Sequence, residues 1–454
     1  MTFKNTAVDV PDELIFAHAE GRVVFFCGAG ISYDAGIPVF KGLFQNVLND
    51  LGIPLSEKEQ EVVDAGQFDQ AFQILERHMK GPKKVRESAA KFLLPAGGKI
   101  PKFGLSKHKA ILKLAQTRDR GHIHLVTTNY DPLFDRASHA LGMRGVPDFA
   151  APLLPIPKPY DWDGIVYLHG KLKIDCADEK NLNSLILTSG DFGVAYLAER
   201  WASRFVSELF KSFTICFVGY RVNDVILRYM MDAIASEEMR GRAHGAVYAF
   251  DGCLEGNEDA VRSDWAAKGI ELIPYRKVLR TAKDGTRFED HSELRKVLDK
   301  WAHSYSEGIS GKSRIVVEEM AHEPDSVSVE GKCAIRRVAW ALADPTGVPA
   351  KSLAELNPPP SIKWLDELYR MPSSKEWLPL FRVPISQAEK YDVHFSLFSH
   401  PPALANAPFV GVVPTVKFGN IDNVQEQLFR WLLCYLNDWQ LFNWFVSRRG
   451  GWGI

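Results

Sequence analysis

The sequence predicts an α/β protein with a doubly wound parallel sheet, followed by a mixed, mostly helical C-terminal region. Residues 1–275 alternate short apolar segments with longer amphipathic ones, which is the pattern of β-α-β units. The short segments are apolar nearly throughout, as strands are when helices cover both of their faces. Beyond about residue 305 the sequence becomes irregular and rich in proline, so a second region is expected there.

Seven short segments are expected to form strands, because each is bounded by Gly, Asp, Asn or Ser. They are Val23–Cys27, His124–Thr127, Ile165–Leu168, Leu185–Leu187, Thr214–Val218, Ala246–Phe250 and Leu272–Pro274. The segments between them are expected to be helical. Asp191–Phe210 and Asn223–Ala235 show the clearest apolar stripe, with residues recurring every three or four positions.

Two domains are expected, one over residues 1–305 and one over residues 306–454. The polar, glycine-containing segment Ser304–Ser313 is typical of a linker between them. The last expected element is a helix from Asp422 to Val446, which is apolar on nearly every side and therefore needs packing on every side. We expect either another subunit or a further part of a longer protein to cover it.

The charge balance excludes several classes of partner. The chain has 55 Lys and Arg against 56 Asp and Glu, a formal net charge of −1. It therefore has no excess of positive charge that would favour unspecific binding to nucleic acid or membrane surfaces. No secretory signal and no run of about 20 apolar residues is visible, so a soluble cytoplasmic protein is expected. The six cysteines form no CxxC pair, so no metal site is expected.

The clearest motif follows the first expected strand, where Cys27–Phe40 reads CGAGISYDAGIPVF. Gly28 and Gly30 would let backbone N–H groups approach a diphosphate at a helix N-terminus. The generic dinucleotide fingerprint G-x-G-x-x-G is incomplete, because Tyr33 stands at the third glycine position. These residues alone therefore leave a tight glycine turn as an alternative.

Three further motifs each follow an expected strand. Thr127–Asp131 reads TTNYD, Leu168–Gly170 reads LHG, and Phe217–Tyr220 reads FVGY with Asn223 and Asp224 shortly after it. Together with GAGISxxxGIPxF, they resemble in the same order the motifs of the sirtuin, or Sir2-like, family. The resemblance covers about residues 12–275, and the FVGY segment is similar to the bacterial branch of the family.

This resemblance implies cleavage of the nicotinamide–ribose bond of NAD. Such a bond breaks through an oxocarbenium-like state, and the reaction needs a neutral group to orient the ribose and a base that titrates near neutral pH. By the resemblance, Asn129 would position the ribose or an attacking water, and His169 would be the general base. From the residues alone, Asn129 as a turn cap and His169 as a structural histidine stay open.

The resemblance also implies the residues that bind NAD. Gly28, Ala29, Gly30 and Ser32 would hold the phosphates, Asp34 and Phe40 would lie on the nicotinamide side, Asp131 would belong to the same site, and Gly219 and Asp224 would lie near the adenosine half. Capping of a helix is an equal alternative for Asp224.

One departure from the family changes the expected reaction. Protein deacylases of the family carry two CxxC pairs after the His-Gly motif, and they bind a structural zinc ion. Residues 171–215 of this chain contain one cysteine, Cys176. The zinc module and one wall of the acyl-lysine cleft are therefore expected to be absent, and water becomes the expected nucleophile.

The resemblance thus implies an NAD hydrolase similar to the defence-associated sirtuins, which deplete NAD during phage infection and abort growth of the infected cell. A phage protein sensed through the C-terminal region and a homo-oligomer, such as a tetramer, would be its partners. The alternatives are an NAD-dependent protein deacylase, a non-catalytic module that senses NAD or ADP-ribose derivatives, and a subunit that acts with another protein such as a short Argonaute or a helicase.

Overall fold

A computed structural model describes the chain except for residues 119, 160, 174–177, 222–229, 231–244, 282–284, 286, 343, 345, 371–422 and 448–454. The chain divides into two compact units. The first, here called the α/β unit, comprises Phe3–Asp9 and Ala17–Ala302. The second, here called the C-terminal unit, comprises Met1–Thr2, Val10–Phe16 and His303–Ile454.

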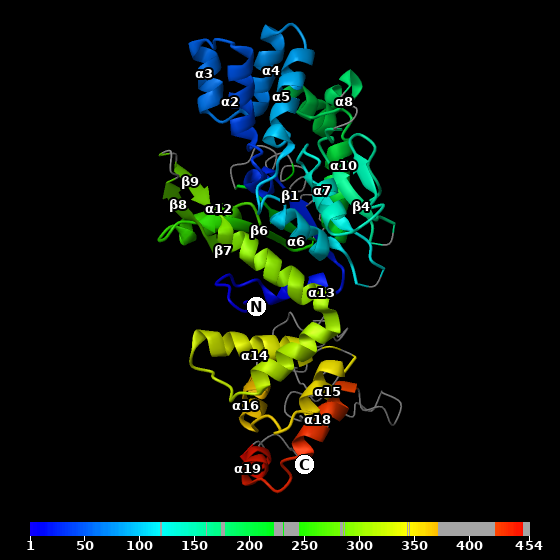
Figure 1. Ribbon diagram of the computed structural model, residues 1–454, viewed down its shortest axis with the longest axis vertical. Coiled ribbons are helices and arrows are strands. Elements are labelled where there is room, and N and C mark those ends of the chain that lie inside the picture. The colour runs from blue at the N-terminus through cyan, green and yellow to red at the C-terminus, as the bar shows by residue number, and fades with distance from the viewer. Residues whose placement is uncertain are drawn as a thin grey trace. The chain divides into compact units, whose positions relative to one another are not determined.

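A seven-stranded sheet forms the centre of the α/β unit, and all of its neighbouring strands are parallel (Figure 1). In spatial order the strands are β3 (Asp148–Ala150), β4 (Gly164–Tyr167), β2 (His124–Thr127), β1 (Val23–Cys27), β5 (Thr214–Val218), β6 (Val247–Cys253) and β7 (Glu271–Arg276). A separate antiparallel hairpin joins β8 (Val278–Thr281) to β9 (Arg287–Asp290). The expected doubly wound parallel sheet is thus confirmed.

The order of the strands reverses direction at β1. The chain passes from β1 to β2 and β4 on one side and then continues with β5 on the other side of β1. In open α/β sheets the ligand crevice lies outside the carboxyl ends of the strands at such a reversal. A ligand site is therefore expected among the segments that follow β1, β2, β4 and β5.

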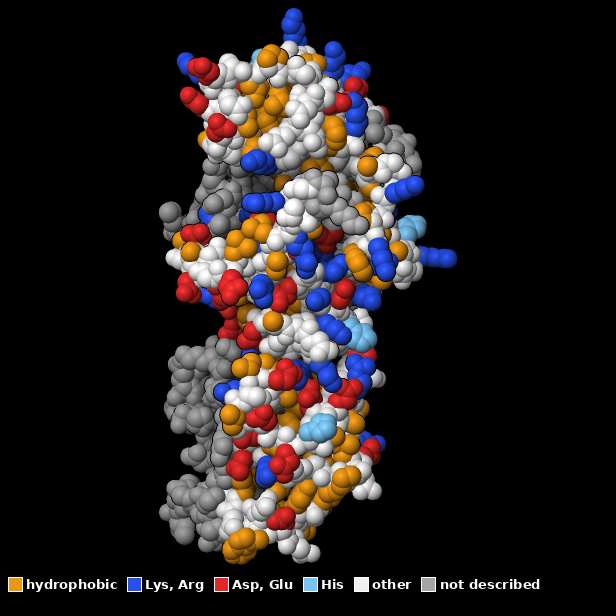
Figure 2. Space-filling model, turned by 60° about the vertical axis from the view of Figure 1, so that its left-hand side comes forward, with side chains coloured by type: hydrophobic (Ala, Val, Ile, Leu, Met, Phe, Trp, Pro, Cys, Tyr) orange, Lys and Arg blue, Asp and Glu red, His pale blue; other side chains and the backbone are white. Residues whose placement is uncertain are grey.

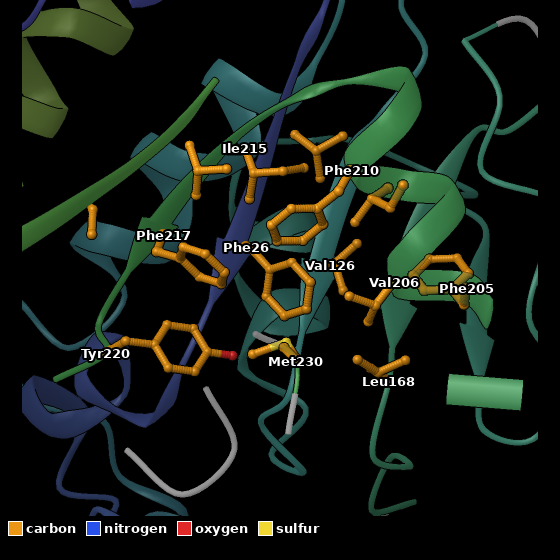
Figure 3. Close-up of a cluster of buried hydrophobic side chains, with 14 of the residues drawn as sticks. Phe26, Val126, Leu168, Phe205, Val206, Phe210, Ile215, Phe217, Tyr220 and Met230 are labelled. Atoms are coloured by element: carbon orange, nitrogen blue, oxygen red, sulfur yellow. The ribbon is translucent and has the colours of Figure 1, made fainter. Parts of the chain in front are cut away.

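Both faces of the sheet are covered, which explains the unbroken apolar strands. On one face, Phe26 and Phe217 lie in a buried cluster with Phe210 of α10 (Trp201–Ser212) (Figure 3). On the other face, the ring of Phe25 lies 5.5 Å from that of Trp301 and 5.6 Å from that of His18. These two residues belong to α13 (Ser292–Met320) and α1 (Asp12–Ala19).

A small helical module is inserted between β1 and β2. It consists of α2 (Phe40–Leu51), α3 (Glu57–Asp64), α4 (Phe68–His78) and α5 (Lys83–Phe92). Phe44, Phe72 and Leu75 form part of its core, which extends to Leu185 and Leu187 of the segment after β4. The described residues of the α/β unit also form α6 (Ser106–Ala115), α7 (Leu133–Ala140), α8 (Glu179–Asn183), α9 (Ser189–Phe192) and α12 (Glu258–Ala266).

The described part of the C-terminal unit is mainly helical. Beyond α13 it contains α14 (Val329–Leu342), α15 (Val348–Ala354), α16 (Lys363–Arg370), α18 (Asn423–Leu433) and α19 (Trp439–Ser447). A buried ion pair joins Lys312 to Asp344 at 2.8 Å, and Arg337 pairs with Glu319 at the same distance. The expectation of a helical C-terminal region is confirmed for the part that is described.

Two expected elements of the α/β unit are wrong. Leu185–Leu187 is not a strand but an irregular connection between α8 and α9, because its backbone groups are bonded by the Arg86 and Asp191 side chains instead of a neighbouring strand. Asp191–Phe210 is not one helix, since a π-helical turn (Gly193–Ala198) separates α9 from α10. Arg200, at φ 61°, begins α10 in a left-handed conformation.

Two expectations for the C-terminal part also differ from the structure. Ser304–Ser313, expected as a linker, lies within α13, where Gly308 at φ 57° and ψ −131° interrupts the helical geometry. The single helix expected from Asp422 to Val446 is two helices, α18 and α19, with turns at residues 434–437 between them. The expected helix Asn223–Ala235 lies outside the described residues except for Met230.

The surface agrees with the balanced charge of the sequence. On the face drawn in Figure 2, basic and acidic side chains are interspersed among polar and apolar ones. None of the described helices is long and apolar enough to cross a lipid bilayer.

Candidate active site

A pocket of about 470 Å³, its open mouth included, lies at the carboxyl edge of the sheet where the segments after β1 and β2 meet. Its polar lining is Ser32, Thr128, Asn129 and Asp131. Its apolar and aromatic lining is Ala29, Ile37, Pro38, Phe40, Leu43, Leu93 and Tyr130. A few polar groups converging on a mostly apolar lining are typical of a small-molecule site.

The polar lining is one hydrogen-bonded chain. The Asn129 side-chain amide donates to Ser32 Oγ at 3.0 Å, and Ser32 Oγ donates to Asp131 Oδ2 at 2.8 Å. The other oxygen of Asp131 accepts the backbone N–H of Leu133 at 3.1 Å. Asn129 retains its side-chain oxygen and its second amide hydrogen for a ligand, which suits it to hold a ribose hydroxyl or a water.

The backbone fixes Asn129 by extending the sheet pairing beyond the strands. Thr128 N–H donates to the Cys27 carbonyl at 3.0 Å, and Asn129 N–H donates to Thr127 Oγ1 at 3.1 Å. The Thr127 hydroxyl in turn donates to the Cys27 carbonyl at 3.1 Å. A threonine at the strand end therefore holds the turn that directs Asn129 toward the first glycine segment.

Asp131 is the titratable group of the pocket. Burial raises its pKa to about 6, against the opposing effect of the hydrogen bonds from Ser32 and Leu133. A carboxyl group with a pKa in this range changes its charge near physiological pH, as groups at functional sites often do.

His169 occupies the equivalent place on the neighbouring strand. β2 and β4 pair in register with Thr127 opposite Tyr167, and the Leu168 N–H donates to the Thr127 carbonyl at 2.8 Å. Asn129 and His169 are each the second residue after the end of their strand. Leu172 N–H then donates to the Tyr130 carbonyl at 2.8 Å, so the two segments remain adjacent beyond them.

The surroundings of His169 differ from those of Asn129. His169 is fully buried and is not among the pocket-lining residues. Its Nε2 atom lies 2.9 Å from the Tyr196 hydroxyl, and its Nδ1 atom has no hydrogen-bond partner. Burial lowers the pKa of the His169 imidazole to about 3, so the ring is neutral at physiological pH.

The glycines after β1 have a structural role that the motif did not indicate. A Cβ atom at Gly28 or Gly30 would lie 2.8 or 2.9 Å from the carbonyl oxygen of Gly219, and Gly219 itself has φ 81°. Gly28 N–H donates to the Val218 carbonyl and Gly30 N–H to the Gly219 carbonyl, both at 2.9 Å. The glycines therefore allow the segments after β1 and β5 to pack on each other, and these two N–H groups are already used.

The segment after β1 also differs from the expected helix start. Residues 29–35 form two short 3-10 turns (Ala29–Ile31 and Tyr33–Ala35), and α2 begins only at Phe40. Phe40 lines the pocket, whereas Asp34 pairs with the buried Lys107 at 3.2 Å. Lys107 also donates to the Gly30 carbonyl at 2.8 Å, so it holds this turn from below.

Of the predicted site residues, the pocket brings together Ala29, Ser32, Phe40, Asn129 and Asp131. His169 follows the neighbouring strand and does not line the pocket, and Gly28, Gly30 and Gly219 pack against one another after β1 and β5. Asp34 does not line the pocket, and Asp224 lies outside the described residues. The assigned roles of all these residues stay predictions.

Two residues near the site carry no recognisable signal in the sequence. His108 on α6 lies with Nε2 3.2 Å from Ser32 Oγ, and burial, followed by the charge of Lys107, lowers its pKa to about 3. Tyr196 contacts His169 from the π-helical turn. Both are brought to the site only by tertiary packing, over separations of 76 and 27 residues.

Within the described part of the chain, no group of three or more His, Cys, Asp and Glu side chains is placed to hold a metal ion. The described part of the segment after Gly170 instead forms α8 and α9, which Arg86 of α5 joins to the helical module. Arg86 donates to Glu76 at 2.9 Å, to Asp191 at 2.7 Å and to the Leu185 carbonyl at 2.6 Å.

The fold and the position of the pocket define an α/β protein of the kind that binds ligands at the carboxyl edge of a parallel sheet. Comparison with known proteins is more specific, since residues 123–273 match the family model of the SIR2-like domain. The expected Sir2-like fold is confirmed for this part of the chain.

Two individual proteins are also similar. The uncharacterized protein y4cA of Sinorhizobium fredii (strain NBRC 101917 / NGR234) is 33% identical over 282 residues, which cover 61% of this chain and 23% of that protein. The chain thus spans less than a quarter of the length of this relative. A solved complex of a mutant Sir2 homologue with ADP-ribose has 16% identity and a TM-score of 0.33, covering 66% of this chain and 98% of the other.

Proposed function

We propose that the protein hydrolyses NAD at the nicotinamide–ribose bond. The observation that carries this proposal is that Asn129 and His169 each lie two residues beyond one of the paired strands β2 and β4, and that Asn129 lines a pocket together with Ser32 and Asp131. Asn129 is a polar residue that binds without changing charge, and the neutral imidazole of His169 can accept a proton. Burial lowers the pKa of His169 to about 3, below the near-neutral value expected from the sequence.

In the proposed reaction, the bond between C1′ of the ribose and the nicotinamide nitrogen breaks, and its electron pair leaves with nicotinamide. A water oxygen forms the new bond to C1′, and its proton passes to His169, which gives ADP-ribose. Asn129 holds the water or a ribose hydroxyl through its side-chain oxygen. The apolar wall around Phe40 excludes other water from the reacting atoms.

The proposal favours water over an acyl-lysine as the nucleophile. The sequence contains no CxxC pair that could form the zinc module of the deacylases. In its place, the segment between Leu182 and Asp191 is held by the buried Arg86 through an ion pair with Asp191 and through backbone carbonyls. Arg86 is also paired with Glu76 of α4. A segment fixed in this way supports His169 without a metal.

We also propose that this activity serves anti-phage defence in the cytoplasm, with a phage protein as the trigger and a homo-oligomer as the active form. The support is the order of the four motifs and the presence of a second, helical unit. Cells carrying the wild-type protein should lose NAD after infection, and cells carrying Asn129→Ala should not. Equal NAD levels in the two strains would contradict the defence role.

The enzymatic proposal is tested by nicotinamide release from NAD by the purified chain, with and without an acetyl-lysine peptide. Release without peptide, lost in Asn129→Ala and in His169→Ala, is expected. A loss of about 10²–10⁴-fold in kcat is reasonable for removal of a general base. Release that requires the peptide would instead assign a deacylase, and NAD binding without turnover under any condition would assign a sensing module.

A further inference from the structure

The imidazole of His169 is enclosed by two aromatic rings from one short stretch of chain. Its ring centroid lies 5.1 Å from that of Phe192 at an angle of 87°, and 6.0 Å from that of Tyr196 at 73°. Both rings are buried, and both contacts have the edge-to-face geometry that aromatic pairs prefer. The orientation of the imidazole is therefore fixed by packing before any ligand binds.

The stretch that carries these rings has an unusual backbone. Residues Gly193–Ala198 form a π-helical turn, in which Glu199 N–H donates to the Val194 carbonyl at 2.9 Å. Turns of this type occur preferentially at functional sites. Ser203 Oγ donates to the Tyr196 carbonyl at 3.0 Å and so ties the turn to α10.

The hydrogen bonds of His169 restrict its tautomer. A neutral imidazole has one N–H donor and one acceptor nitrogen, and here only Nε2 has a partner, the Tyr196 hydroxyl at 2.9 Å. If Tyr196 donated to Nε2, a buried N–H at Nδ1 would remain without an acceptor. If Nε2–H instead donates to the Tyr196 oxygen, the buried Nδ1 keeps a free lone pair. A buried donor without an acceptor is rarer than a buried acceptor without a donor, so the second arrangement is favoured.

We infer that Tyr196 is a positioning residue that accepts the Nε2–H of His169 and thereby leaves Nδ1 as the proton-accepting nitrogen. The inference rests on the proposed function, because it assigns the basic atom of the proposed base. In the reaction, the proton of the attacking water passes to Nδ1. The resulting imidazolium keeps its Nε2–H bonded to the Tyr196 oxygen, and the proton returns to solvent after the product leaves.

The titratable neighbours of this pair are few among the described residues. Tyr196 is the ionisable group in direct contact with His169, and Tyr130 lies close enough to Tyr196 to contribute to its electrostatic surroundings. Burial raises the pKa of the Tyr196 hydroxyl far above its ordinary value. Tyr196 thus stays neutral, and its oxygen remains available as an acceptor.

The tautomer is measured directly by NMR of the full chain with ¹⁵N-labelled histidine rings, where His169→Asn identifies the His169 signals among the 13 histidines. The expected wild-type spectrum shows a protonated Nε2 and an unprotonated Nδ1. In Tyr196→Phe, which keeps the aromatic ring, His169 should populate the other tautomer. A wild-type spectrum with a protonated Nδ1 would overturn the inference, whatever the variants do.

Kinetics provide the second readout. Tyr196→Phe should lower kcat for nicotinamide release by roughly 10-fold with KM unchanged, a smaller loss than removal of the base itself. The matched control is Tyr275→Phe, which removes another tyrosine hydroxyl bonded to a histidine, His291 at 2.8 Å, away from the pocket. Tyr275→Phe should leave kcat at the wild-type value.

The outcomes separate the two proposals. If His169→Ala releases nicotinamide as fast as the wild type, the proposed function is wrong, while the NMR spectra still decide whether Tyr196 sets the tautomer. If His169→Ala is inactive but Tyr196→Phe keeps both the wild-type tautomer and the wild-type kcat, the inference is wrong and the proposed function stands.

Discussion

Asn129 and His169 lie at equivalent positions beyond two neighbouring parallel strands, but in opposite surroundings. Asn129 is part of a polar chain with Ser32 and Asp131 that lines an open pocket. His169 is enclosed by the rings of Phe192 and Tyr196. The sheet register determines which residues are close together, whereas the segments packed above the sheet determine their solvation and charge.

The difference arises from what covers each strand end. The 3-10 turns after β1 present a serine and backbone to Asn129, and α6 adds His108 behind that serine. The π-helical turn after α9 presents aromatic side chains to His169. One strand end therefore presents hydrogen-bonding groups, and the other surrounds a neutral ring with aromatic side chains.

The largest expected effect concerns the support of the aromatic side of the site. Arg86→Met should lower the free energy of unfolding by about 3–5 kcal/mol, because it leaves the partly buried Glu76 and Asp191 without their cation. Urea denaturation measures the change. Arg86→Lys, which keeps the charge but loses most of the hydrogen bonds, should cost less than Arg86→Met, and the reverse order would contradict the role of the ion pairs.

On the polar side, Asp131→Asn should stabilise the protein at pH 8. Because burial raises the pKa of Asp131 from 3.8 to about 6, ionising it costs folding free energy as pH rises from about 4 to about 6. The variant removes this cost, which amounts to at most about 3 kcal/mol. Denaturation at pH 8 and at pH 4 tests this, since the gain should disappear at pH 4.

His169 should show the opposite dependence on pH. Burial lowers its pKa from 6.5 to about 3, so the unfolded chain takes up a proton that the folded protein does not. This contribution to stability is complete above pH 6.5 and falls by about 2 kcal/mol at pH 5. The free energy of unfolding should therefore fall by about 2 kcal/mol less in His169→Gln than in the wild type between pH 7.5 and pH 5. His139→Gln, on the exposed side of α7, is the control and should lose as much as the wild type. Equal losses in both variants would show that His169 is solvated.

The smallest effect concerns the backbone that ends the π-helical turn. Arg200 has φ 61°, a conformation that glycine adopts without strain, so Arg200→Gly should stabilise the protein by about 1 kcal/mol. Arg204→Gly, within α10, should destabilise it by about 1 kcal/mol because glycine is a poor helix former. A melting temperature that rises in Arg200→Gly and falls in Arg204→Gly would support the assigned geometry. Shifts in the same direction in both variants would contradict it.

Much of the fold was predictable from the sequence. β1, β2 and β5 begin and end at the predicted residues, because unbroken apolar runs between Gly, Asn and Asp leave few other choices for a buried strand. The expected third glycine of the fingerprint is absent, yet the turn forms, since Gly28 and Gly30 need only fit against Gly219. Leu185–Leu187 was not predictable, because a short buried apolar run looks the same whether or not a strand pairs with it.

The sequence predicted only those residues of the site that directly follow a strand. Asn129, Asp131 and His169 each follow a strand, and local sequence carries that information. The contact between Tyr196 and His169 depends on a π-helical turn that replaces the regular helix expected for Asp191–Phe210. The contact between His108 and Ser32 joins two segments that have no pattern in common.

In the proposed reaction, Asn129 and His169 act on the same bond despite their different surroundings. The most direct test is a double-mutant cycle for nicotinamide release with Asn129→Ala, His169→Ala and the combined variant. Residues that act as a unit lose activity non-additively. The double variant should therefore be about as slow as the slower single variant. Losses that multiply, or a single variant with wild-type activity, would contradict it.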